Sequence, residues 1–363
     1  MNVTCEARWR RIASGSAYGF TEITVRAFLV PCALLYGWIT AVRAWLYRSG
    51  AFRAGRLPRP VISVGNITVG GTGKTPVTAY LARLLITKGA RVAVLSRGYG
   101  GSLAGSIAIV SDGTRIYYTA QECGDEPCLL ASTIPGLIVV VGADRHAAGL
   151  LAMEQLRPDV FLLDDGFQHL RLHRDLNILL LDARRPFGNG WCLPAGLLRE
   201  QWQAALRSDL VIMTRCLSEA AKPVCLPADH PCFISRHVLR DLVPLVGGTA
   251  CPFAVLAGRK VMAFAGIASP ELFFNELEAL GMDVVARVGL PDHAKYDQQC
   301  EQLLYDTMTS SGAECAVTTE KDGVKLSDLP AGLAAVTFLA RLELALEHPE
   351  LLESMVTSIL PVR

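Results

Sequence analysis

A glycine-rich string between an apolar run and an amphipathic stretch constrains the fold of this chain more than any other feature. Residues 61–64 form a short, mostly β-branched run, which predicts a buried strand. From Thr75 onward, apolar residues recur on one face of a predicted helix. Between them stands the string Gly70-Gly71-Thr72-Gly73-Lys74-Thr75. A strand, a glycine loop, Lys-Thr and a helix in this order predict a phosphate-binding P loop.

The residue types of this loop suit a nucleoside triphosphate with its magnesium ion. Glycines let backbone N–H groups close around phosphate oxygens, and the helix N-terminus adds partial positive charge. Lys74 is expected to reach the outer phosphates, and the Thr75 hydroxyl to ligate Mg²⁺. The strict pattern asks for glycine at position 68, where Thr68 stands. We therefore predict an ATP site at residues 70–75.

A second run, residues 158–165, predicts an apolar strand that ends in two carboxylates, Asp164 and Asp165. A carboxylate at the carboxyl end of such a strand faces the Mg²⁺ beside a P loop. Since adjacent strand residues point to opposite sides, we expect one of the two to reach the metal directly. Further strands are expected at 176–181 and 209–213. The alternation predicts an α/β fold, a mostly parallel sheet with helices on both faces.

Length and composition bound the organisation of the chain. The 363 residues are enough for two lobes. We expect an N-terminal helical segment (1–56), a P-loop core (57–221), a linker (222–255) and a smaller C-terminal α/β lobe (256–363). With 35 Lys and Arg against 34 Asp and Glu, the chain lacks the basic excess typical of nucleic-acid binding. Its eleven cysteines form no C-x-x-C pair, which favours reduced, packed thiols.

An uncharged run near the N-terminus, residues 27–42, is flanked by Arg26 and Arg43. At about 1.5 Å per residue this run is shorter than the roughly 30 Å hydrocarbon core, and Pro31 shortens any regular span further. We expect a helix that lies in, or dips into, an anionic membrane face. A buried core helix and a fully spanning helix are the alternatives.

Three classes of P-loop protein compete for this sequence. A GTPase normally carries Asn-Lys-x-Asp, and the nearest string here has Glu320 where that lysine belongs. A membrane-partitioning ATPase carries a signature lysine at the position of Val69, and it stays the alternative. The third class, a small-molecule or lipid kinase, must account for several further polar strings.

Those strings follow predicted strands and turns. In chain order they are Ser96-Arg97-Gly98-Tyr99-Gly100, Gly124-Asp125-Glu126-Pro127, Asp164-Asp165-Gly166-Phe167-Gln168-His169, Leu198-Arg199-Glu200, Pro291-Asp292-His293 and Thr319-Glu320-Lys321-Asp322. Together with the P loop, this set resembles the tetraacyldisaccharide 4'-kinase family of lipid A biosynthesis. The resemblance implies transfer of the γ-phosphoryl of ATP to the 4'-hydroxyl of a lipid A disaccharide precursor. It also implies work at the cytoplasmic face of the inner membrane, and we expect no obligate protein partner.

The resemblance and the strand-end positions assign roles to individual residues. The resemblance implies that Asp125 acts with His293 as the base. Since the expected boundaries put the two residues in different lobes, we expect them to face each other across a cleft. The other expected catalytic residues are Lys74 and Asp165; the expected metal ligands are Thr75, Asp164 and Glu126. Expected contacts to the acceptor are Gln168, His169, Arg171 and Arg199, and expected contacts to the nucleotide, besides the P loop, are Glu320, Lys321 and Asp322.

Overall fold

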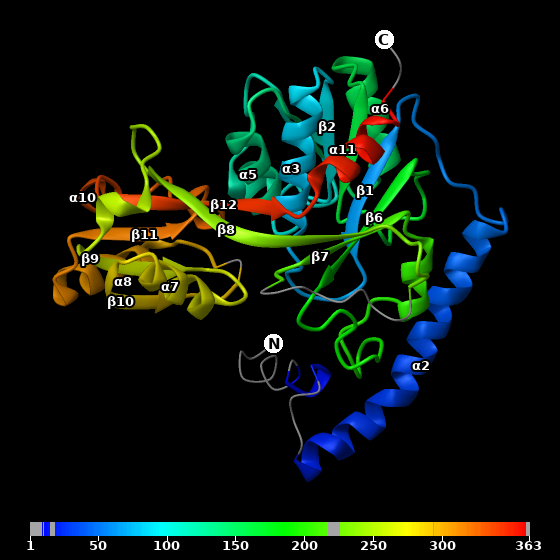
Figure 1. Ribbon diagram of the computed structural model, residues 1–363, viewed down its shortest axis with the longest axis horizontal. Coiled ribbons are helices and arrows are strands. Elements are labelled where there is room, and N and C mark those ends of the chain that lie inside the picture. The colour runs from blue at the N-terminus through cyan, green and yellow to red at the C-terminus, as the bar shows by residue number, and fades with distance from the viewer. Residues whose placement is uncertain (1–8, 10, 15–18, 217–225, 293, 361–363) are drawn as a thin grey trace. The chain divides into compact units, whose positions relative to one another are not determined.

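The computed structural model describes residues 9, 11–14, 19–216, 226–292 and 294–360 (Figure 1). Within it the chain forms two compact units. The first unit comprises Met1–Ser96, Asp144–Arg236 and Ala345–Arg363, and the second comprises Arg97–Ala143 and His237–Leu344. The chain therefore enters and leaves the second unit twice.

The first unit contains the predicted P-loop strand and helix at the expected place. Its elements are α2 (Phe20–Arg48), β1 (Val61–Asn66), α3 (Lys74–Thr87), β2 (Val92–Ser96), α6 (Arg145–Gln155), β5 (Val160–Asp164), β6 (Leu176–Asp182), the 3-10 helix η1 (Trp202–Arg207), β7 (Leu210–Thr214), the start of β8 (Cys232–Pro244) and α11 (Pro349–Thr357). Every residue of β1, β2, β5 and β7 is buried, as continuous apolar strands of a parallel sheet require.

The sheet of the first unit has β1 at its centre, with β5 and then β2 on one side and β6, β7 and β8 on the other. All of these neighbours pair in parallel. Because the strands are parallel, β1 and β5 end at the same edge, with Val64 level with Asp164. The helix α3 packs against β1, β5 and β2. Ligands of such sheets bind beyond the carboxyl ends of the strands, where the P loop also lies.

The N-terminal helix α2 is longer than the uncharged run that predicts it. It has 29 residues and continues through Pro31, Arg26 and Arg43, which gives a length of about 44 Å. The expectation that it falls short of the hydrocarbon core is therefore wrong, because the flanking arginines extend the helix instead of ending it. The segment Ile23–Arg48 is long and apolar enough to cross a membrane by length and composition.

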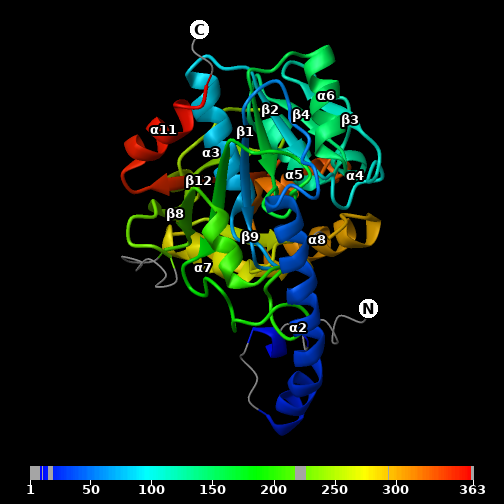
Figure 2. The same cartoon turned by 90° about the vertical axis from the view of Figure 1, so that its right-hand side faces the viewer.

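The same helix contradicts the buried-core alternative. In its most apolar window only 11% of the residues are buried. Figures 1 and 2 both show the N-terminal part of α2 extending beyond the sheet of its own unit. One narrow strip does pack inward, since Ala33 is buried among core residues and Tyr36 packs against them. Most of the helix surface is thus apolar and exposed.

The second unit combines residues 97–143, which are inserted between two parts of the first unit, with residues 237–344. Its elements are β3 (Ala108–Asp112), α4 (Ala120–Cys123), α5 (Asp125–Thr133), β4 (Ile138–Val141), the rest of β8, the 3-10 helix η2 (Phe253–Leu256), β9 (Lys260–Ala265), α7 (Pro270–Ala279), β10 (Asp283–Gly289), α8 (Gln298–Ser311), β11 (Cys315–Thr319), α9 (Glu320–Gly323), α10 (Ala331–Ala334) and most of β12 (Thr337–Leu346). The strands β10, β9, β11 and β12 are parallel neighbours. The strands β3 and β4 form an antiparallel pair.

These units divide the chain at other residues than the expected boundaries. Residues 97–143, expected in the P-loop core, group with the C-terminal region because α5 packs against α9. The expected linker 222–255 contains the thirteen-residue strand β8. That strand buries Ser235 and leaves Val238 45% exposed, so its sequence shows no clean alternation of apolar and polar residues.

Candidate active site

The P loop lies between β1 and α3 in the backbone conformation that its glycines permit. Gly70 has φ 118° and Gly73 has φ 80°, values that disfavour any side chain. Gly73 is also the N-cap of α3, and no side chain caps the helix there. The first N–H groups of α3 are therefore not taken by a capping side chain, as phosphate binding requires. Thr214 fixes the loop from β7, because its hydroxyl donates to the carbonyl of Thr72 at 2.8 Å.

An arginine that sequence reasoning missed lies over this loop. The guanidinium of Arg215 comes within 3.5 Å of the place where a Cβ on Gly71 would stand. Its other nitrogen, Nη1, lies 3.1 Å from Asp182, at the end of β6. Arg215 has φ 59°, a left-handed conformation at the end of β7. The signal in the sequence was its position directly after a predicted strand, which is where such sheets bind ligands.

Asp164 and Asp165 both face α3. The Thr78 hydroxyl donates to Asp164 Oδ1 at 3.2 Å, and Asp164 is 1% exposed. Asp165 lies 3.7 Å from Lys74 Nζ. The expectation that the two carboxylates point to opposite sides is wrong, because β5 ends at Asp164 and Asp165 turns to φ 52°. Strand alternation no longer applies to a residue in that conformation.

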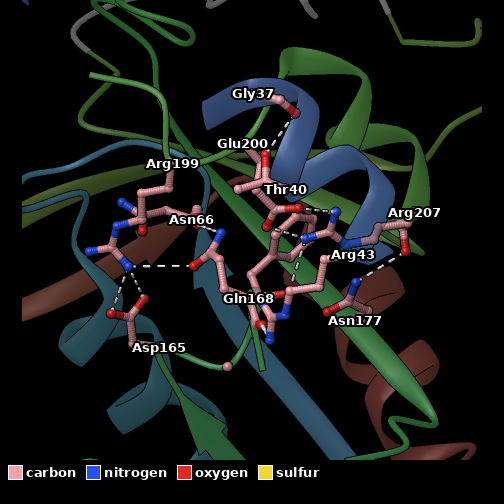
Figure 3. Close-up of polar contacts among 12 residues, drawn as sticks. Gly37, Thr40, Arg43, Asn66, Asp165, Gln168, Asn177, Arg199, Glu200 and Arg207 are labelled. Carbon is pink, nitrogen blue, oxygen red and sulfur yellow. Dashed lines mark hydrogen bonds and ion pairs between the residues drawn. The ribbon is translucent and has the colours of Figure 1, made fainter. Parts of the chain in front are cut away.

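Asp165 has a second and closer partner in Arg199. One guanidinium nitrogen of Arg199 donates to both carboxylate oxygens of Asp165, at 3.0 and 2.9 Å (Figure 3). The same nitrogen contacts the side-chain oxygen of Gln168 at 3.4 Å. Burial would raise the pKa of Asp165, but the charges of Lys74 and Arg199 outweigh it and hold the pKa below its ordinary value. Asp165 is therefore ionised at neutral pH.

Three arginines hold the loop that follows Asp165 by its carbonyl groups. Arg174 donates to the carbonyls of Gly166 and Phe167, at 3.4 and 3.2 Å. Arg207 donates to the Phe167 carbonyl at 3.1 Å and forms two bonds of 2.6 Å to Glu200. Arg43, from α2, donates to the Gln168 carbonyl at 3.3 Å (Figure 3). Sequence reasoning missed these contacts, since nothing in the sequence indicates which loop a distant arginine supports.

The other residues expected to contact the lipid acceptor, Gln168, His169 and Arg171, differ in their surroundings. The Gln168 amide donates to the Asn66 carbonyl at the end of β1, at 2.8 Å. His169 is partly buried, and burial together with the positive charge of Arg145 lowers its pKa to about 4. Its Nε2 is buried and has no hydrogen-bond partner among the described residues. Arg171 is exposed, and its carbonyl accepts a bond from Gly55 in the segment after α2.

A second polar cluster lies within the second unit. Asp125, the first residue of α5, lies 3.6 Å from the ammonium of Lys325. Lys325 also pairs with Asp322 at 3.0 Å and donates to the Ala294 carbonyl at 3.2 Å. Lys321 pairs with Asp292 at 3.0 Å. The stretch 320–325 thus contacts Asp125 and both neighbours of His293, which itself lies outside the described residues.

Glu320, Lys321 and Asp322 were expected at the nucleotide. In the structure Glu320 accepts a bond from the Leu342 amide at 3.3 Å, and Asp322 accepts bonds from Gly266 and Thr319 at 3.0 and 2.7 Å. These contacts all lie inside the second unit. A nucleotide contact by these residues stays a prediction.

The expected metal ligands do not all lie together in the described part of the chain. There, no three His, Cys, Asp or Glu side chains gather as a metal site. Glu126 belongs to the second unit, whereas Thr75 and Asp164 belong to the first. Thr75 in the first turn of α3 and the buried Asp164 do suit Mg²⁺, which keeps several waters and needs only one or two protein carboxylates.

Comparisons with known proteins connect this geometry to one family. The model of the tetraacyldisaccharide-1-P 4'-kinase family matches residues 25–360. The chain belongs to this family. It is 56% identical over 360 residues to the tetraacyldisaccharide 4'-kinase of Pelobacter propionicus, with 99% of both chains covered. It is 50% identical over 361 residues to that of Geobacter sulfurreducens, with 99% of this chain and all of the relative covered.

A solved structure of the family confirms the fold. A crystal structure of LpxK from Aquifex aeolicus in complex with ATP has a TM-score of 0.80 and 37% identity to this chain. The match covers 93% of this chain and all of the Aquifex aeolicus chain. The expected α/β fold and kinase function are confirmed by these matches, and the alternative of a partitioning ATPase finds no support in them.

Proposed function

We propose that the chain transfers the γ-phosphoryl group of ATP to the 4'-hydroxyl of a tetraacyldisaccharide 1-phosphate. Membership of the 4'-kinase family supports the acceptor. The observation that supports the chemistry most is the placement of Lys74 and Arg199 around the ionised Asp165, directly beside the P loop. Two positive charges beside the P loop support the proposal that they neutralise the phosphoryl group.

The first unit supplies the proposed nucleotide site. Residues 70–73 bind the phosphates through their N–H groups, and Lys74 turns from Asp165 to the outer phosphate oxygens. Thr75 and Asp164 are the proposed Mg²⁺ ligands, with Glu126 as the further candidate. Mg²⁺, when bound, neutralises phosphate charge and orients the group that is transferred.

The proposed base is the pair Asp125 and His293. Transfer forms a bond between the 4'-oxygen and phosphorus and breaks the bond to the leaving oxygen of ADP, so the hydroxyl proton must be accepted. A carboxylate beside an imidazole orients the ring and raises its basicity. Asp165 stays ionised throughout and holds Arg199 in place after Lys74 has turned to the phosphate.

The proposed acceptor contacts follow the strand ends of the first unit. Arg199 and Arg171 can bind the 1-phosphate or the transferred phosphoryl group, because a guanidinium matches phosphate oxygens in pairs. Gln168 and His169 offer neutral polar groups to the sugar. His169 is uncharged at neutral pH, so its buried nitrogen can exchange a hydrogen bond with a hydroxyl without adding charge.

We further propose that α2 holds the protein on the cytoplasmic face of the inner membrane. Its exposed apolar residues are Ile23, Val25, Phe28, Leu34, Leu35, Trp38, Ile39 and Trp45. A lipid surface would cover these side chains, and arginines at the two ends of the helix would meet anionic headgroups. The acyl chains of the acceptor could then stay in the bilayer while its sugar reaches the site.

The test is phosphate transfer from γ-labelled ATP to a tetraacyldisaccharide 1-phosphate in detergent. The wild type should label the lipid, and Lys74→Ala should abolish labelling. ATP hydrolysis that depends on Lys74 without any labelled lipid would overturn the proposal and favour a membrane-associated ATPase.

A further inference from the structure

The second unit contains a buried lysine, Lys325, that the proposed chemistry does not yet use. Its side chain is 6% exposed. Its ammonium lies 3.0 Å from Asp322 Oδ1, 3.2 Å from the Ala294 carbonyl and 3.6 Å from Asp125 Oδ2. The ring of Tyr296 lies beneath it, 5.1 Å from the ammonium to the ring centroid. Three parts of the chain, namely α9, the segment 294–296 and the start of α5, thus meet at one positive charge.

The number of partners matches the chemistry of an ammonium group. An ammonium has three donors, and here three acceptors converge on it from α9, from the segment before α8 and from the start of α5. A buried charge is tolerated only with such partners, since its desolvation is costly. Lys325 is therefore confined to one position, and it confines its partners in turn.

Asp322 is the closest partner of this lysine. It is fully buried, and its Oδ2 accepts from the Gly266 amide at 3.0 Å and from the Thr319 hydroxyl at 2.7 Å. A Cβ on Gly266 would come within 2.9 Å of the other carboxylate oxygen, Oδ1. A residue with a side chain at position 266 would therefore crowd the Asp322 carboxylate. The carboxylate that pairs with Lys325 is thus fixed by the Gly266 amide and the Thr319 hydroxyl.

Lys325 also acts on the segment that contains His293. The residue after the histidine, Ala294, gives its carbonyl to Lys325, and the residue before it, Asp292, pairs with Lys321 at 3.0 Å. Both lysines come from the short stretch after β11. Asp125 and the neighbours of His293 are therefore tied to the same support.

We propose that Lys325 is a positioning residue of the phosphoryl transfer, which fixes the Asp125 carboxylate and the backbone beside His293 in one arrangement. This inference rests on the proposed function, in which Asp125 and His293 form the base. Lys325 does not take the proton itself. Its ammonium holds the Asp125 carboxylate and the Ala294 carbonyl together. Displacements of about 1 Å in catalytic groups can cost about 100-fold in rate.

The test compares Lys325→Met with Arg341→Met, in full-length protein and detergent. Methionine keeps the apolar stem of lysine and removes the charge. Arg341 pairs with Asp241 in the same unit, so its variant loses a comparable ion pair away from the proposed base. We expect kcat to fall about 100-fold in Lys325→Met with the KM for ATP changed by less than about twofold. Arg341→Met should lose thermal stability but keep kcat. Equal kcat values in the two variants would overturn the proposal.

A double-mutant cycle separates this inference from the proposed base. If Lys325 acts through Asp125, then Asp125→Asn with Lys325→Met should be no slower than Asp125→Asn alone. Additive losses would overturn the positioning role and leave the base intact. A wild-type rate in Asp125→Asn would overturn the base, and with it the inference.

Lys325→Met leaves a buried carboxylate without its counter-ion and can fail to fold for that reason. A second variant, Lys325→Met with Asp322→Asn, removes this charge as well. Lys325→Arg keeps the charge but spreads its donors in a plane, so it cannot meet the same three acceptors. We expect both variants to fold and to show the same loss of kcat, and a wild-type kcat in either would overturn the proposal.

Discussion

Arg199 and Asp165 form the closest ion pair beside the P loop: one guanidinium nitrogen lies 2.9 and 3.0 Å from the two carboxylate oxygens. Lys74 lies farther from the same carboxylate, at 3.7 Å. Since ion pairs weaken with distance, Arg199 satisfies most of the charge of Asp165. Lys74 is thus restrained near the loop without being tightly bound, which leaves it available to a phosphate group.

Arg199→Ala should weaken the use of ATP. Without Arg199, Asp165 has Lys74 as its remaining close cation, and the lysine must leave that pair to reach a phosphate. We expect kcat/KM for ATP to fall about tenfold, which corresponds to about 1.4 kcal/mol, the range of one charge-assisted hydrogen bond. Steady-state kinetics with varied ATP measure this. Arg199→Lys should retain more activity than Arg199→Ala, and equal values for both would contradict the explanation.

His169→Gln should flatten the pH dependence of stability. Burial and Arg145 lower the pKa of His169 from 6.5 to about 4, so the unfolded chain binds a proton that the folded chain does not. Wild-type stability therefore rises with pH between about 4 and 6.5, and is lost as the pH falls through this window. Asp144 opposes the shift, whereas Arg174 and Arg171 add to it.

The measurement is urea unfolding of both proteins in detergent at pH 5 and pH 7.5. We expect the wild type to lose more of its free energy of unfolding between these pH values than the variant. Parallel pH curves would show that His169 is not the group responsible.

Gly65→Ala should displace the loop that follows Asp165 and lower both the stability and the activity of the protein. A Cβ on Gly65, in the buried strand β1, would lie 2.6 Å from the Phe167 amide nitrogen. This contact is with backbone, so the loop must shift, at a cost of about 1–3 kcal/mol in unfolding free energy. The rate should fall as well, because Asp165 lies in the same loop. Gly332→Ala in α10 is the matched control, since nothing lies within 4 Å of its added Cβ. Its stability should stay within about 1 kcal/mol of wild type, and equal stability of the two variants would contradict the packing argument.

Trp38→Glu should weaken membrane binding without affecting the fold. Trp38 is 62% exposed on α2, so the substitution removes no core contact. A charge on that surface opposes burial among lipids by about 2 kcal/mol or more. Co-sedimentation with vesicles that contain anionic lipid measures the bound fraction. Leu351→Glu, at a 60% exposed position on α11, serves as the control and should bind as wild type does. Equal loss in both variants would point to net charge instead of α2.

The P loop and the carboxylate strand could be predicted because their signals are local. Gly70 and Gly73 occupy backbone conformations that few other residues adopt, and the helix begins at Lys74, one residue before the expected start at Thr75. Asp165 was found by the same reasoning, but its direction was not, because the strand ends one residue earlier than the sequence suggests.

The supporting contacts could not be predicted in this way. Arg43, Arg174 and Arg207 come from three separate segments and converge on carbonyl groups of residues 166–168. Carbonyl groups are the same at every position, so no residue type marks them as acceptors. Lys325 escaped notice for a related reason, since two of its partners, Asp125 and Ala294, lie far from it in sequence.

The sequence by itself determined the parallel P-loop sheet, the apolar N-terminal helix and the family. These depend on short patterns of glycine, apolar residues and carboxylates, whose conformational preferences act over a few residues. Only the tertiary structure decided that Asp125 shares a compact unit with the segment around His293, and that one buried lysine supports both. Burial makes such charge contacts strong and specific, and burial is a property of the packed chain.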